Sequence, residues 1–159
     1  MLGDAGRLSD GPKYMGYTHN LLLTDKDDPR TLLSNPSANS TCYREDVGFW
    51  SDTLVALFAL TSKRDLDANF DELSDEVTNT HAENKNGPDF VTIIPRSVSD
   101  SFAELLETNI EKLADNWANI EEELTWHETL SPPQMLLILI EASRIARQTG
   151  RFVAIYSFE

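Results

Sequence analysis

The sequence predicts an α+β domain whose small sheet, of about three to four strands, is covered by about four helices. Three observations support this class. Short apolar runs bounded by turn residues alternate with longer segments whose apolar residues recur at helical spacing. No linker-like segment interrupts this pattern, and 159 residues are enough for one hydrophobic core. We therefore expect a single domain over residues 14–159, preceded at residues 1–13 by a flexible tail that has several glycines and no periodicity.

The first part of this domain contains one clear strand and one undefined segment. Residues 16–24, GYTHNLLLT, predict a strand with buried leucines, and DKDDP then predicts a turn. Residues 25–45 show no clear pattern, although an unstructured loop of that length is uncommon in a compact domain. This segment is therefore mobile, functional, or the site of a short strand near TCYR, residues 41–44.

The first predicted helix covers residues 47–62, with Asp46 placed to cap it. Its apolar residues follow helical spacing: Val47, Trp50, Leu54, Leu57 and Phe58.

The next segment, residues 65–76, has two possible structures. Oxygen-bearing side chains occupy the ligand positions of an EF-hand calcium loop: Asp65, Asp67, Asn69, Asp71 and Glu76. Such a loop needs glycine at its sharp turn, where this chain has Phe70. Leu66, Phe70, Leu73 and Val77 instead share one face of a helix. We therefore predict a helix from about Leu66, capped by Asp65 or Asp67, and no calcium binding.

A buried strand and a long helix follow. Residues 89–95, DFVTIIP, predict a strand that ends at proline. Ser101 and Glu104 form a capping box for a helix that continues to residue 124. Its apolar stripe consists of Phe102, Leu106, Ile110, Leu113, Trp117, Ile120 and Leu124.

The last helix has clear signals at both ends. Ser131, Pro132 and Gln134 supply the cap, the first helical position and the capping box, and Gly150 suits the C-terminal end. The apolar run at residues 135–140 predicts a turn that is buried on most sides, Leu137 and Ile138 included. Residues 151–158 then predict a strand, which could pair in parallel with residues 89–95.

The negative charge is concentrated in the middle of the chain. The net charge is −14, and residues 65–128 alone hold 17 Asp and Glu against three Lys and Arg. Carboxylates also persist near the C-terminal end of the predicted long helix, where each costs about 0.3–1 kcal/mol against the helix dipole. This pattern is typical of a well-solvated surface or of a surface that meets a basic partner. It argues against nucleic acid as a partner, because the phosphates would be repelled.

We predict that the partner-binding face lies on the two acidic helices. The carboxylates would steer a basic protein, and Trp126 would anchor it, because an exposed aromatic residue is a strong interface anchor. The predicted residues are Asp71, Glu72, Asp75, Glu76, Glu104, Glu107, Glu111, Asp115, Glu121, Glu122 and Trp126.

The sequence carries no recognisable catalytic or metal-binding pattern. His19, His81 and His127 lack metal-ligand spacing, and Cys42 has no neighbouring histidine. No phosphate-binding glycine loop or nucleophile elbow is present. We therefore predict no catalytic residue, no metal and no cofactor. The lone cysteine, the absence of a signal-like apolar stretch and the absence of a long apolar run predict a cytoplasmic protein that does not enter a membrane.

In size, acidity, single cysteine and α+β order, the chain resembles bacterial immunity proteins, the cytoplasmic antidotes of secreted nuclease toxins. The resemblance is one of class, so no site residue comes from it. It implies a protein that covers the basic cleft of a toxin domain and needs no cofactor. Two alternatives stay open: a nucleic-acid mimic whose regular carboxylates replace phosphates along the long helix, and an enzyme with an unrecognised site.

Overall fold

A computed structural model describes residues 16–159, so the tail predicted at residues 1–13 lies outside the described part. The fold is α+β, as predicted, with one five-stranded sheet in the order β2-β1-β5-β4-β3. The strands are β1 (Thr18–Thr24), β2 (Thr41–Arg44), β3 (His81–Glu83), β4 (Phe90–Ile94) and β5 (Phe152–Phe158). Strands β1, β4 and β5 confirm the three predicted runs, and β2 is the short strand foreseen near TCYR.

Seven α-helices and two 3-10 helices accompany this sheet within residues 16–159. They are α1 (Pro29–Ser34), α2 (Pro36–Asn39), α3 (Ser51–Ser62), α4 (Phe70–Thr78), α5 (Arg96–Ala103), η1 (Glu107–Asn109), α6 (Ile110–Ile120), η2 (Glu122–Trp126) and α7 (Pro132–Thr149). The predicted counts of about four helices and three to four strands were therefore too low. The prediction missed α1, α2 and the three-residue strand β3 because each is short.

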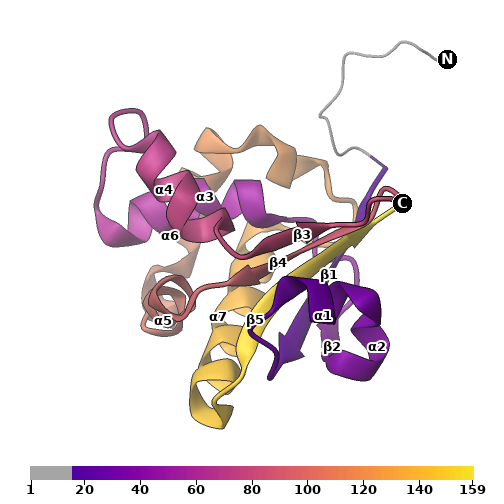
Figure 1. The fold of residues 1–159 in the computed structure, drawn as a ribbon. Coiled ribbons are helices and arrows are strands. Elements are labelled where there is room, and N and C mark those ends of the chain that lie inside the picture. Colours follow the sequence, from indigo (N-terminus) through magenta and orange to yellow (C-terminus); the bar gives the residue numbers. More distant parts are fainter. Residues whose placement is uncertain (1–15) are drawn as a thin grey trace, which may run out of the picture.

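The sheet separates two unequal apolar layers. Figure 1 shows α3, α4, α5, α6 and α7 gathered on one side and the short helices α1 and α2 on the other. Because successive side chains of a strand point to opposite faces, Leu21 and Leu23 join the large cluster while Leu22 joins the small one. The small cluster is closed by Leu32 of α1.

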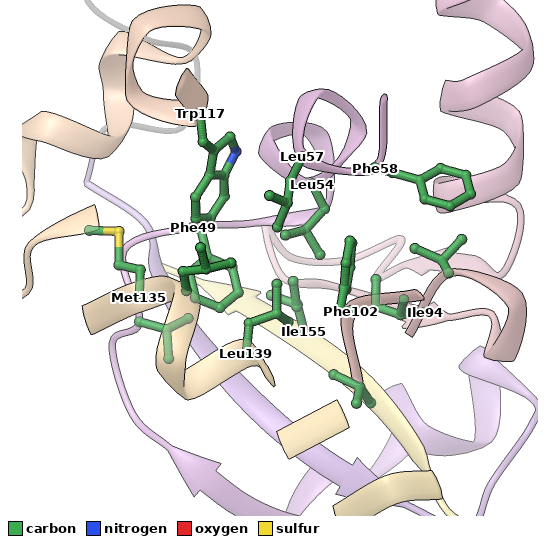
Figure 2. Packing of buried hydrophobic residues seen from close by; sticks show 14 of the residues in the cluster. Phe49, Leu54, Leu57, Phe58, Ile94, Phe102, Trp117, Met135, Leu139 and Ile155 are labelled. Atoms are coloured by element: carbon green, nitrogen blue, oxygen red, sulfur yellow. The ribbon is translucent and has the colours of Figure 1, made fainter. Parts of the chain in front are cut away.

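The large layer is built around aromatic contacts (Figure 2). Trp117 of α6 is fully buried and lies against Phe49, with ring centroids 6.1 Å apart. Phe58 of α3 meets Phe102 of α5 edge to face at 6.5 Å. These pairs join three helices over one face of the sheet, which fixes where the ends of α3 and α6 lie.

The parallel pairing of the last two predicted strands is wrong. β5 lies in the middle of the sheet and pairs antiparallel with both β1 and β4. The edge pairs β1–β2 and β3–β4 are also antiparallel. The intervening helices form a long excursion over one face, rather than a parallel crossover.

The long helix predicted over residues 101–124 is also wrong, because α5 ends at Ala103 and the chain turns before α6. The backbone of Leu106 is extended, and its side chain, predicted within the apolar stripe, is 65% exposed. Arg144 of α7 stabilises this break. Its guanidinium donates hydrogen bonds to the carbonyl oxygens of Ala103 (2.9 Å) and Leu105 (2.6 Å). A side chain distant in sequence thus caps α5, which local spacing could not reveal.

Two other helix starts differ from the prediction. The helix expected from Val47 begins at Ser51, and the preceding Asp46 and Gly48 have positive φ of 49° and 75°. The helix expected from Leu66 begins at Phe70, whose side chain is 53% exposed rather than part of the buried stripe. The carboxylate of Asp65 accepts backbone hydrogen bonds in the turn before α4.

Helix α7 has the predicted ends but buries a narrower face than expected. Its first turn contains the capping box of Ser131 and Gln134, and Gly150 ends the helix in a left-handed conformation. Leu137, expected in the core, is 42% exposed, and Ile138 is partly buried. The apolar run is therefore amphipathic in the fold.

We predict that Leu139→Ala lowers the free energy of unfolding by about 2–5 kcal/mol, because Leu139 is fully buried and its truncation leaves a cavity. Leu137→Ala, the matched change on the exposed side of the same helix, should cost less than about 1 kcal/mol. Urea unfolding followed by circular dichroism measures both values. Equal losses in the two variants would contradict the orientation of α7.

Candidate functional site

The predicted partner-binding residues lie on four segments instead of two helices. Asp71, Glu72, Asp75 and Glu76 belong to α4. Glu104 and Glu107 lie around the break after α5. Glu111 and Asp115 lie on α6, and Glu121, Glu122 and Trp126 lie in or beside η2. The carboxylates from Glu104 to Asp115 therefore do not share one helix.

Three arginines offset part of this charge. Arg64 forms ion pairs with Glu72 (3.4 Å) and Glu76 (2.9 Å). Arg144 pairs with Glu107 at 3.3 Å and Arg147 pairs with Glu104 at 3.5 Å. These exposed or half-exposed pairs contribute little stability, but they compete with a partner for the carboxylates.

Other predicted acids have no ion pair within residues 16–159. Those on α6 are Glu111 and Asp115, which are exposed and one helical turn apart. The remaining ones are Asp71, Asp75, Glu121 and Glu122. The negative charge that no arginine offsets is therefore spread over α4, α6 and η2, and the exposed Lys112 on α6 offsets part of it.

Three carboxylates lie near enough to interact electrostatically where η2 meets the start of α3. Burial, together with the charges of Glu123 and Asp52, raises the pKa of Glu121 to about 7. Burial and the charge of Asp52 also raise the pKa of Glu123. We call these three residues, Asp52, Glu121 and Glu123, the carboxylate cluster.

Sequence reasoning identified only Glu121 of this cluster. Asp52 falls within the predicted first helix, with no functional role assigned to it, and Glu123 is not among the predicted partner-binding residues. A signal for Asp52 existed, because an acidic residue in the first turn of a helix is stabilised there by the helix dipole.

Apolar side chains flank the carboxylate cluster at the surface. Ile120, the last residue of α6, is 41% exposed, and Trp126, the last residue of η2, is 50% exposed. The exposure of Trp126 agrees with its predicted role as an anchor. Trp50 and Trp117 are buried, as expected of core residues.

The segment after η2 is held by His127. Its Nδ1 accepts the backbone N–H of Leu130 at 2.8 Å, so the hydrogen-bond pattern assigns the proton to Nε2, which lies 3.1 Å from the carbonyl oxygen of Asp46. The imidazole also packs where a Cβ on Gly48 would lie, 2.6 Å away. Trp126 is thus displayed on a fixed loop.

One histidine–serine pair resembles a nucleophile and its base. Nδ1 of His19 lies 2.6 Å from the hydroxyl of Ser157. Both residues are buried, and desolvation lowers the pKa of His19 to about 4. Because Ser157 is fully buried, the pair does not present a hydroxyl to a substrate, and His19 joins β1 to β5 while it stacks on Trp50.

The described residues contain no group of three or more His, Cys, Asp or Glu side chains that could hold a metal ion. Residues 65–76, considered above as a calcium loop, form a turn followed by α4. Among residues 16–159, none of the helices has both the length and the apolarity that a membrane span requires.

Comparison with known proteins gives no relative. No protein-family model, curated sequence or solved structure matches the chain.

We predict that Glu121→Gln stabilises the fold at about pH 8 and that this gain disappears at about pH 4. The folded pKa of about 7 exceeds the ordinary value of 4.5, so the folded chain holds a proton that the unfolded chain has already released. Stability therefore falls as pH rises from 4.5 toward 7, and glutamine removes that loss. Thermal unfolding across this range measures the effect. The exposed neighbour provides the control, because Glu122→Gln should keep the wild-type pH profile.

Proposed function

We propose that the protein is an immunity protein that binds and neutralises a basic toxin domain, of the nuclease class, inside the bacterial cytoplasm. The observation that carries this proposal is the segment around η2, where Glu121, Glu122 and Glu123, which form no ion pair among residues 16–159, lie in the chain between the exposed Ile120 and Trp126. An apolar anchor surrounded by charges of one sign is how a protein interface combines tight contact with fast encounter.

The carboxylate cluster lowers the stability of the fold, and this loss of stability supports the proposal. Burial and mutual repulsion disfavour ionised Glu121 and Glu123, so the cluster weakens the fold near neutral pH. A positively charged partner would remove that repulsion. The alternative of a nucleic-acid mimic loses its main support, because regular carboxylate spacing required the long helix that the fold breaks after Ala103.

The direct test uses the gene next to this one. If a large secreted toxin is encoded there, we expect its isolated C-terminal domain to arrest bacterial growth when expressed alone and to be harmless when co-expressed with this protein. Continued arrest despite a stable, expressed antidote would contradict the proposal. A phage gene cluster in place of the toxin would favour the mimic.

We predict that the two parts of the site affect different rate constants. Neutralising Glu111 and Asp115 together, by Glu111→Gln with Asp115→Asn, should slow association with the toxin domain about three- to tenfold at low salt, and the difference should vanish as salt screens the charges. Trp126→Ala should instead speed dissociation about tenfold or more. Surface plasmon resonance over a salt series measures both rates.

Two matched variants serve as controls for these rates. Asp27→Asn with Glu45→Gln removes two exposed charges that precede and follow α1, α2 and β2, and Phe70→Ala removes an equally exposed aromatic side chain from α4. Neither should alter the rates as the site variants do. If Phe70→Ala speeds dissociation while Trp126→Ala does not, the anchor lies on α4 and the proposed face is wrong.

A further inference from the structure

A pocket opens beside the carboxylate cluster, between the start of α3 and the edge of the sheet. It contains about 510 Å³ of empty space, its open mouth included. Its lining residues come from α3, α4, β3, β4 and the residue before α3: Trp50, Ser51, Asp52, Thr78, His81 and Phe90. The site described above uses only Asp52 among them.

Rigid aromatic rings form much of this lining. Trp50 and Phe90 are each 8% exposed, and neighbouring rings hold them in place. His19 stacks on Trp50 with centroids 5.0 Å apart, and His81 lies 5.5 Å from Phe90. Buried rings that cannot rotate freely offer a flat, preformed surface to a planar or cationic group.

The electrostatics of the pocket favour a cation. Asp52 contributes a carboxylate to the lining, and it is close enough to Glu121 and Glu123 to raise the pKa of both. Helix α4 ends at Thr78, so the negative end of its dipole faces this region. No lysine or arginine lies among the described residues that line the pocket.

We propose that this pocket receives the guanidinium group of one arginine side chain on the surface of the basic partner. The proposal rests on the function proposed above and names the contact through which that partner is recognised. An arginine fits better than a lysine, because its planar group stacks on aromatic rings while its N–H donors form paired hydrogen bonds with a carboxylate. A phosphate or another anion is disfavoured by the same carboxylates.

In this proposal the pocket and Trp126 contact different groups of the partner. The pocket would hold a charged side chain at the start of α3, whereas Trp126 presents an apolar surface at the end of η2. An arginine bound at Asp52 would also lie near Glu121 and Glu123, whose repulsion it would relieve. Binding one arginine is thus expected to favour the ionised forms of Glu121 and Glu123.

The test uses the full chain and a small probe, so it does not require the partner. N-acetyl-arginine methylamide is titrated into ¹⁵N-labelled protein while NMR records backbone and indole N–H shifts. We expect saturable shifts at the Trp50 indole, Ser51 and Thr78, with a dissociation constant in the millimolar range. N-acetyl-citrulline methylamide, which has the same shape without the charge, should bind at least about tenfold more weakly.

Variants assign the contact to the pocket. Asp52→Asn should weaken binding of the arginine probe at least about fivefold. Glu45→Gln, an equal change of charge next to β2 at the opposite edge of the sheet from β3, should leave it unaltered. Thr78→Arg, which places a guanidinium of the protein itself at the pocket, should abolish the shifts. Circular dichroism establishes that each variant is folded.

Three results would overturn the inference: no saturable shift with the arginine probe, shifts centred on other residues, or equal binding of the citrulline probe. These results are independent of the growth test. Neutralisation of a toxin without arginine binding would remove only this inference, whereas arginine binding without any toxin to neutralise would remove only the proposed function.

Discussion

The position of Trp117 determines both the packing of the helices and the charge of the surface above them. Its fully buried indole N–H donates a hydrogen bond to the carbonyl oxygen of Thr53 at 2.9 Å. This contact joins α6 to the first turn of α3. Because Asp52 precedes Thr53 and Glu121 follows Trp117 by one turn, the same contact brings their carboxylates together. A core interaction therefore sets the electrostatics of the site.

The core of the protein follows the usual rules of burial, whereas several surface positions do not. The two apolar layers bury most of the large side chains, and α7 and the end of α5 are capped by Ser131 and Arg144. Exposed apolar side chains occur on α4, after α5, on α7 and at Ile120 and Trp126, but only the last two lie in the same segment as the carboxylates Glu121 and Glu123. Local choices that weaken a fold are typical of functional surfaces, because they are retained for binding rather than for stability.

Much of this fold was predictable from local sequence. Three strands, α7 with its caps and the burial of Trp50 and Trp117 follow from periodicity and capping signals. The short helices α1 and α2 also carried signals, since Asp28 and Asn35 each cap a proline-initiated turn. The break after α5 carried no local sequence signal, because it depends on Arg144, which belongs to α7.

The candidate site was predictable only in part, for the same reason. An excess of acids in residues 65–128 and an exposed Trp126 could be read from composition and position. The cluster with Asp52 and the pocket beside it join segments far apart in the chain. Their geometry depends on tertiary packing, which spacing within one segment does not encode.

The central position of β5 determines when the sheet can form during protein synthesis. β5 pairs with both β1 and β4, yet it follows both in the chain. During synthesis β1 and β4 leave the ribosome before β5. Until β5 follows, the edges with which they pair to it are unpaired and their apolar faces are uncovered. The sheet therefore closes only after translation has passed β5, so chaperones that shield nascent chains should determine how much active protein accumulates.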